Sequence, residues 1–320
     1  MLPQFSEIIG SGQRTRPSLP VRVMQSRLWN VVLAVLVLIG AAIALYPSGA
    51  DWFSTISHSR TLQVYQSAVQ SKNDAEQLRD LRLATRYNES LGPNTVLDPF
   101  AGTSEGGSDG NAISETGDSS SARQYDSLLN PAGDGVMATI VVPKIGLDLP
   151  IYHGTTEETL ARGIGHLYGT SLPVGGKGTH AVLTGHNGYA LSQLFSNIHK
   201  LVKGDTFQIH VEGETLTYRV DQIQIVEPDD MSSLQRVSGK DYVTLVTCTP
   251  TGVNSHRLLV RGVRVDTAGV ANASLNENLS ADRVVIPFPW WAVWLGSALT
   301  AAVWIVAGPT ITVPARHRRL

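Results

Sequence analysis

The chain has 320 residues, of which 42% are hydrophobic and 16% are charged, and its formal net charge at pH 7 is −2. A net charge this small creates no strong field to attract nucleic acid, so the sequence predicts no nucleic-acid partner. The chain has one cysteine, Cys248. An internal disulfide is therefore excluded, and the folded part must be stabilised by a hydrophobic core.

The first predicted element is a hydrophobic helix over residues 28–46, which follows an arginine-containing segment, residues 1–27. The helix has no charged side chain, and its length is close to what is needed to cross a hydrocarbon core of about 30 Å. A cleaved signal peptide is the alternative, because small residues follow the hydrophobic run. The length of the run favours an uncleaved transmembrane helix.

A second hydrophobic segment, residues 286–308, is also free of charge. Trp290, Trp291 and Trp294 gather near its start, as aromatic side chains do at membrane–water interfaces. A basic tail, residues 309–320, follows. Because basic residues flank the outer ends of both hydrophobic segments, the positive-inside rule places both termini in the cytoplasm and the intervening chain outside the cell.

Between these segments the sequence predicts a helical region and then a loop. Residues 51–92 carry hydrophobic residues at helical spacings, and Asn73 or Asp74 is predicted to cap a second helix in this region. Residues 93–125 are rich in Gly, Ser and Asp and are predicted to be flexible. Within this loop lies Leu97-Asp98-Pro99-Phe100, for which an ordinary Asp-Pro turn is the simplest interpretation.

Residues 126–268 alternate short β-rich runs with turn signals. Seven or eight strands of this kind predict a mainly β domain, either a closed barrel or a sandwich. The predicted strands are 138–142, 149–153, 179–184, 206–211, 214–226, 241–247 and 257–265, with a hairpin turn at Glu212-Gly213. Short helices are predicted over 156–161 and 191–198, and residues 269–285 are predicted to be a linker.

Cys248 is the candidate nucleophile of this domain, because it lies at the end of a β-branched strand that Thr249-Pro250 terminates. A half-buried structural cysteine is the alternative. His186 follows another apolar strand and lies between two glycines, which suits a catalytic imidazole, although a histidine in a loop is more often a solvated side chain. Arg257 begins the strand after Cys248.

A thiol, an imidazole and a guanidinium together suit acyl transfer. The thiolate attacks a carbonyl to form a thioester, and the imidazole donates and accepts the protons. A guanidinium stays charged and offers fixed donors to the developing oxyanion. His256 is a rival base, but it neighbours Arg257 on a strand and is expected to face the opposite side of the sheet.

These motifs resemble those of the sortases. Thr244-Leu245-Val246-Thr247-Cys248, with Thr249-Pro250 and the run 255–262, is similar to the cysteine signature of that family, and Thr184-Gly185-His186 is similar to its histidine motif. Asp98-Pro99-Phe100 resembles the lid of the class C, pilin-polymerising sortases. The resemblance covers residues 54–265. Thr251 departs from the aromatic residue that is frequent at that position in the family.

The resemblance implies an eight-stranded sortase β-barrel with N-terminal helices and a lid loop, flanked by two transmembrane helices. Cys248 would be the nucleophile, His186 the acid and base, and Arg257 the group that stabilises the oxyanion or positions the substrate. In the lid, Asp98 would reach Arg257 and Phe100 would cover Cys248. Three further residues are candidates for substrate binding: Asn187, Thr247 and Thr249.

The implied substrate is a pilin with a C-terminal LPXTG-type signal, which is cleaved between Thr and Gly and joined to a lysine of the next pilin. The implied location is the bacterial cell membrane, with the catalytic domain extracellular and the lipid bilayer as a partner. No metal or organic cofactor is implied. Three alternatives remain open: a housekeeping sortase that joins proteins to a peptidoglycan precursor, a secreted thiol hydrolase, and a membrane-anchored β-domain that binds wall components without catalysis.

Overall fold

The chain divides into two compact units in the computed structural model, which describes residues 27–92, 100, 119–188, 192–265 and 288–307. Unit 1 contains Met1–Tyr46 and Trp290–Leu320, and unit 2 contains Pro47–Pro289. The predicted linker, residues 269–285, lies outside the described residues.

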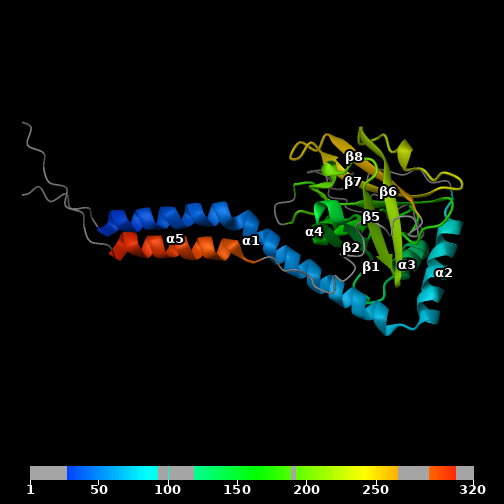
Figure 1. The fold of residues 1–320 in the computed structure, drawn as a ribbon, viewed down its shortest axis with the longest axis horizontal. Helices are drawn as coiled ribbons and strands as arrows, with labels where there is room; N and C mark the ends of the chain where they lie inside the picture. The colour runs from blue at the N-terminus through cyan, green and yellow to red at the C-terminus, as the bar shows by residue number, and fades with distance from the viewer. Residues whose placement is uncertain (1–26, 93–99, 101–118, 189–191, 266–287, 308–320) are drawn as a thin grey trace, which may run out of the picture. The chain divides into compact units, whose positions relative to one another are not determined.

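Apolar helices make up the described part of unit 1 (Figure 1). Helix α1 spans Arg27–Ser71, and its first part belongs to this unit, while α5 spans Trp290–Ala307. Both are long and apolar enough to cross a membrane, by length and composition. Helix α1 continues through Pro47, so the hydrophobic helix expected over residues 28–46 and the helical region expected from residue 51 belong to one helix. A proline removes one backbone hydrogen bond and kinks a helix, and here long helical runs on either side continue the helix.

Unit 2 is built on a closed barrel of eight strands, which confirms the predicted mainly β fold and decides for the barrel over the sandwich. Around the barrel the order is β1-β2-β3-β4-β7-β8-β6-β5. The strands are β1 (Val136–Val142), β2 (Leu147–His153), β3 (Ile164–His166), β4 (Thr179–Thr184), β5 (Thr206–Val211), β6 (Glu214–Val226), β7 (Asp241–Thr249) and β8 (His256–Arg264).

The sequence predicted the longer strands well. The bounds of β4, β5 and β6 are those expected, and Glu212-Gly213 forms the predicted hairpin turn, with positive φ at both residues. The three-residue strand β3 was not predicted, because a segment this short shows no alternation of polar and apolar residues.

The short helices differ more from the expectations. Helix α4 (Glu157–Arg162) lies one residue beyond the predicted 156–161. The helix predicted over 191–198 is wrong, because turns lead there into a short 3₁₀ helix, Ile198–Lys200. Two further 3₁₀ helices are Pro143–Ile145 and Ser232–Leu234.

Helix α3 (Ser119–Ser127) lies where the sequence predicted flexible loop. Its sequence is polar apart from Ala122 and Tyr125, so its pattern gives little sign of an amphipathic helix. Tyr125 is buried, and its hydroxyl is 2.8 Å from Nδ1 of His166 on β3. Burial lowers the pKa of His166 to about 4, so the ring is neutral at physiological pH. The helix is therefore stabilised by tertiary contacts to the barrel rather than by its own propensity.

The N-terminal helices are joined to the barrel at the turn between α1 and α2 (Asp74–Ser90). Asn73 caps α2 through a capping box with Glu76, which settles the choice between Asn73 and Asp74. Nζ of Lys72 lies 2.7 Å from Oε1 of Glu212 in the β5–β6 hairpin, and 2.8 Å from Oδ2 of Asp80.

We expect Lys72→Met to lower the free energy of unfolding of unit 2 by about 2–3 kcal/mol. The Glu212 side chain is 0% exposed, and removal of its partner leaves a buried charge without compensation. Denaturant titration of the full chain in detergent micelles measures the change. Lys144→Met is the control, since Lys144 pairs with Asp205 at the surface, where an ion pair contributes less than about 1 kcal/mol. Equal effects of the two changes would contradict a special role for the Lys72 pair.

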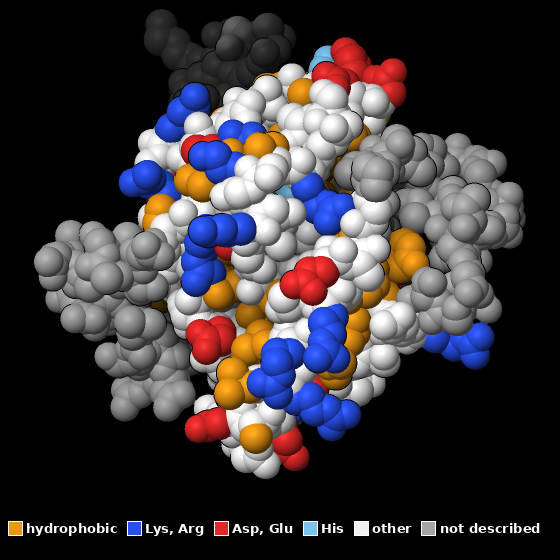
Figure 2. Space-filling view, turned by 90° about the vertical axis from the view of Figure 1, so that its right-hand side faces the viewer, with side chains coloured by type: hydrophobic (Ala, Val, Ile, Leu, Met, Phe, Trp, Pro, Cys, Tyr) orange, Lys and Arg blue, Asp and Glu red, His pale blue; other side chains and the backbone are white. Residues whose placement is uncertain are grey.

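Basic and acidic side chains are mixed on the face shown in Figure 2, which is seen from the right-hand side of Figure 1. Lys and Arg side chains lie close to Asp and Glu side chains there, and no single sign of charge covers this face. This agrees with the small net charge of the sequence.

Candidate active site

The parallel pairing of β4 with β7 brings the candidate histidine and cysteine to the same end of the barrel. Thr184 is the register partner of Val246, and His186 and Cys248 each lie two residues further along. Because the two strands run in the same direction, their carboxyl ends meet at one edge. Oγ1 of Thr247 donates to the carbonyl oxygen of Gly185 at 2.6 Å, which joins the two chain segments there.

Cys248 and Arg257 are direct partners in the antiparallel pair of β7 and β8. Directly opposite residues place their side chains on the same face of a sheet, so the thiol and the guanidinium share one face. Cys248 is 8% exposed and Arg257 is 7% exposed. Nη1 of Arg257 donates to the carbonyl oxygens of Asn254 at 2.9 Å and of His256 at 3.2 Å, which orients the guanidinium.

Phe100 packs against this face and lies close to the His186 and Arg257 side chains. It is 3% exposed and packs in the same hydrophobic cluster as Cys248. The centre of its ring lies 5.8 Å from that of His186 and 5.2 Å from Cζ of Arg257. The other residues of the predicted lid, Leu97, Asp98 and Pro99, lie outside the described residues.

His186 has a carboxylate neighbour that sequence reasoning missed. Nε2 of His186 lies 3.6 Å from Oε1 of Glu157, at the start of α4. Burial lowers the pKa of His186 below its usual value, and the Glu157 carboxylate opposes this effect. No local pattern connects the two residues, because α4 and β4 become neighbours only when the barrel forms.

The three residues predicted to bind substrate have different environments. Thr247 is buried, and its hydroxyl donates to the carbonyl oxygen of Gly185. Asn187 donates from Nδ2 to the carbonyl oxygen of Cys248 at 2.9 Å. Thr249 is the last residue of β7 and pairs with His256.

The loops on either side of the site are fastened to each other by Asn187. Oγ1 of Thr251 donates to Oδ1 of Asn187 at 3.1 Å, so one carboxamide connects the histidine loop to the cysteine and to the loop after it. Gly188, which has a φ of +74°, lies so close to Thr251 that a Cβ there would clash with its methyl group. The small residue at 251, which departs from the family pattern, therefore packs directly against the histidine loop.

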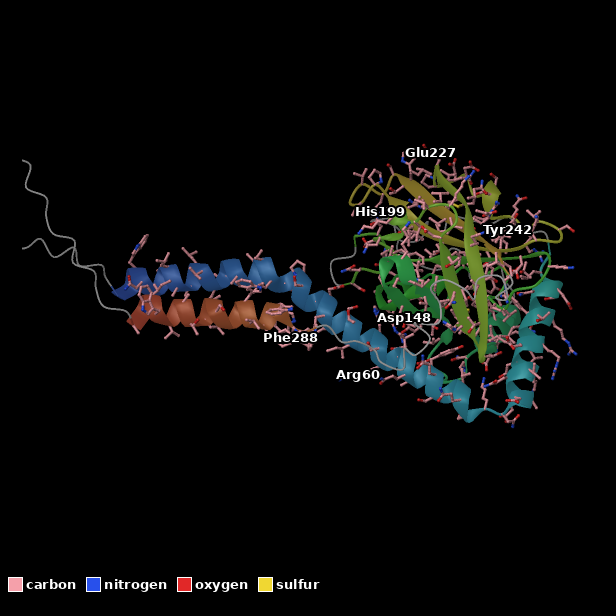
Figure 3. All side chains as sticks on the ribbon, viewed as in Figure 1. Arg60, Asp148, His199, Glu227, Tyr242 and Phe288 are labelled. Carbon is pink, nitrogen blue, oxygen red and sulfur yellow. The ribbon has the colours of Figure 1, made fainter. Side chains whose placement is uncertain are left out.

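His256 is directed away from the thiol, as strand alternation predicts. Nε2 of His256 lies 3.1 Å from Oε1 of Glu227, which follows β6 and is labelled in Figure 3. The His256 side chain is half-exposed, and Oγ of Ser255 is 2.8 Å from its Nδ1. His256 is thus engaged on the other face of the strand and is not positioned as a base for Cys248.

A separate polar groove of about 590 Å³ lies within unit 2, between α1 and the barrel. Its lining includes Asp51, His58, Gln66 and Asp148, the last of which is labelled in Figure 3, but none of the three candidate catalytic residues. Within the described part of the chain, no group of three or more His, Cys, Asp or Glu residues is arranged to hold a metal ion. A buried thiol, an imidazole and an oriented guanidinium on one face are suited to nucleophilic acyl transfer.

The chain is similar to known proteins in its sequence and its fold. A family model described as a sortase domain matches residues 140–265. Sortase A of Bacillus anthracis is 35% identical over 132 residues, which are 41% of this chain and 61% of that protein. The match therefore spans less than two thirds of the length of this curated relative.

Solved structures match a larger share of the chain than the family model does. Sortase C-1 from Actinomyces oris is 45% identical, with a TM-score of 0.53, and the match covers 59% of this chain and 99% of that one. Sortase C of Streptococcus pneumoniae is 39% identical, with a TM-score of 0.55, and the match covers 65% of this chain and 97% of that one. The latter structure is described as informative on catalysis and pilin substrate specificity.

Proposed function

Because this chain belongs to the sortase family, with solved neighbours of class C, we propose that it is a membrane-anchored cysteine transpeptidase that polymerises pilins. It cleaves an LPXTG-type sorting signal between Thr and Gly and transfers the acyl group to a lysine of an acceptor pilin. The observation that carries this proposal is the packing of Phe100 against the face that presents Cys248, His186 and Arg257.

In this proposal the three polar side chains divide the chemistry. The Cys248 thiolate attacks the carbonyl carbon of the threonine, and the C–N bond to glycine breaks as imidazolium His186 donates a proton to the leaving amine. Arg257 donates hydrogen bonds to the oxyanion. The amine of the acceptor lysine then attacks the thioester and gives its proton to neutral His186. The isopeptide bond forms as the C–S bond breaks, and the thiolate and imidazolium are restored.

The cover over the thiol favours pilin polymerisation over the housekeeping reaction. Phe100 is the described residue of the Asp98-Pro99-Phe100 triplet, and its ring lies against both His186 and Arg257. A substrate must displace it to reach Cys248, which suits a class C enzyme with a lid. The description of the Streptococcus pneumoniae relative in terms of pilin specificity supports the same substrate class.

The two apolar helices support a location in the bacterial cell membrane. The N-terminal part of α1 and all of α5 cross the bilayer in this proposal, and residues 1–27 and 309–320 lie in the cytoplasm, since basic residues flank the outer ends of both segments. The barrel, residues 126–268, is then extracellular.

Incubation of the full chain, in detergent micelles, with an LPXTG peptide tests the proposed reaction. We expect mass spectrometry to detect a thioester of the peptide, cleaved after threonine, on Cys248. An acceptor lysine peptide should convert this adduct to an isopeptide. If only the hydrolysed acid forms at saturating acceptor, the chain is a thiol hydrolase. The absence of any adduct would support the non-catalytic alternative.

We expect the double change Asp98→Ala, Phe100→Ala to speed alkylation of Cys248 by a small thiol reagent by roughly tenfold to a hundredfold. A closed lid that is stabilised by about 1.4–2.7 kcal/mol leaves about a tenth to a hundredth of the molecules open, so its loss raises the open population by about tenfold to a hundredfold. The rate is measured below saturation at a single pH. Val253→Ala, an exposed change in a neighbouring loop, is the control. Equal rates in wild type and double variant would show that the Asp98-Pro99-Phe100 triplet does not act as a lid over Cys248.

A further inference from the structure

The carboxylate nearest to the His186 imidazole has no role in the mechanism above. Glu157 begins α4, which Thr156 caps by accepting a hydrogen bond from the backbone amide of Thr159. The cap holds the first turn of the helix in place, and with it the Cα of Glu157. From this position Oε1 of Glu157 reaches to 3.6 Å from Nε2 of His186.

The reaction proposed here needs a charged imidazole at its start. Only imidazolium can donate a proton to the leaving amine, and a charged ring beside the sulfur also favours the thiolate. The surroundings of His186 oppose this charge, because Phe100 covers the ring and most of the side chain is buried. Burial alone would therefore keep His186 neutral over more of the physiological pH range.

We propose that Glu157 is a positioning residue that holds His186 in its charged form and directs the ring for proton donation. This inference rests on the proposed function, since it assigns an electrostatic partner to the proposed acid. A carboxylate close to one ring nitrogen stabilises imidazolium and favours the orientation in which that nitrogen faces it. Burial lowers the pKa of His186 and Glu157 raises it, so the two groups act in opposite directions on the same ring.

The other ionisable groups of the site contribute differently. The Cys248 thiol on β7 stabilises imidazolium only when it is ionised, and the Arg257 guanidinium on β8 opposes a second positive charge. Glu157 on α4 is the carboxylate that lies close to the ring. Its side chain is 63% exposed, so solvent and salt weaken its effect on the ring.

The test compares Glu157→Gln with Glu158→Gln in the full chain in detergent micelles. Both changes remove one exposed carboxylate from the first turn of α4, but only Glu157 is paired with His186. The pKa of His186 is read by NMR of histidine-labelled protein, with the signal assigned by its absence in His186→Asn. We expect Glu157→Gln to lower this pKa by about 0.3–0.7 units, the size of an exposed ion pair.

Two further readouts separate electrostatics from structure. The alkaline limb of the rate of Cys248 acylation by an LPXTG peptide should move to lower pH by the same amount. At a pH above this limb, the rate should therefore fall about twofold to fivefold, whereas near the optimum it should change little. In about 1 M salt the difference between wild type and Glu157→Gln should shrink, because the Debye length falls to about 3 Å. Glu157→Asp should restore part of the shift.

Equal titration of His186 in the two glutamine variants would overturn the proposal. A loss of rate by the same factor at every pH would also overturn it, since that would indicate a structural role for Glu157. The NMR titration needs no substrate. If the chain does not acylate the peptide at all, the proposed function fails, while the pairing of Glu157 with His186 is still decided by the titration.

Discussion

Replacement of Cys248 by alanine is expected to abolish both the thioester adduct and the isopeptide product. The chain has no second cysteine that could act instead. Alanine removes only the sulfur. The Cys248 carbonyl oxygen accepts a hydrogen bond from Asn187, and the Cys248 backbone pairs with Arg257 in the sheet. Alanine keeps both of these backbone contacts. The loss should therefore be chemical, not structural.

The measurement for Cys248→Ala is mass spectrometry of the full chain after incubation with an LPXTG peptide, followed by analysis of the product with an acceptor lysine peptide. An unchanged melting temperature, within a few degrees, serves as the control for folding. If the alanine variant still formed the isopeptide at the wild-type rate, a nucleophile other than the thiol would have to carry the reaction, and the mechanism proposed here would be wrong.

Arg257→Lys is expected to lower kcat by about 10²- to 10³-fold, the usual cost of one contact to an oxyanion. The guanidinium donates from Nη1 to the carbonyl oxygens of Asn254 and His256, and it also stacks on the Phe100 ring. A planar group can make these contacts and still present further N–H donors to a substrate. An ammonium keeps the charge but lacks the planar fork and the second set of donors.

Arg261→Lys is the matched control for Arg257→Lys, because it makes the same chemical change on the same strand. The Arg261 guanidinium pairs with Asp221 and stacks on Tyr242, which lies at the other end of β7 from Cys248. Steady-state kinetics with the LPXTG peptide should give a kcat close to wild type for Arg261→Lys. A similar kcat for both variants would show that Arg257 serves the fold and not the reaction.

Much of this protein could be predicted from local patterns in its sequence. Apolar runs without charge predicted the two hydrophobic helices, and alternation predicted β4, β5 and β6 to the residue. The single cysteine at a strand end and the histidine between glycines indicated the candidate site. These signals are readable because a strand or a helix imposes its own period on the side chains that it buries.

Local patterns failed where a contact across the fold stabilises a segment. Helix α3 has few apolar residues, and Tyr125 anchors it to His166 of the barrel. Proline disfavours the interior of a helix, yet α1 continues through Pro47. In both cases a local preference of about 1–3 kcal/mol opposes the helix. The stabilising free energy from residues distant in the sequence, or from the long helical runs on either side, exceeds it.

By itself, the sequence determined the class of fold, the hydrophobic segments and the identity of the candidate nucleophile, because each depends on neighbours within a few residues. Only the tertiary structure decided what surrounds that nucleophile. The register of β4, β7 and β8 brings His186 and Arg257 to Cys248, Phe100 comes from a separate segment to cover them, and Glu157 comes from α4 to face the imidazole. The distances and charges that set the reactivity of a site arise from pairings between distant segments, and no periodicity along the chain records them.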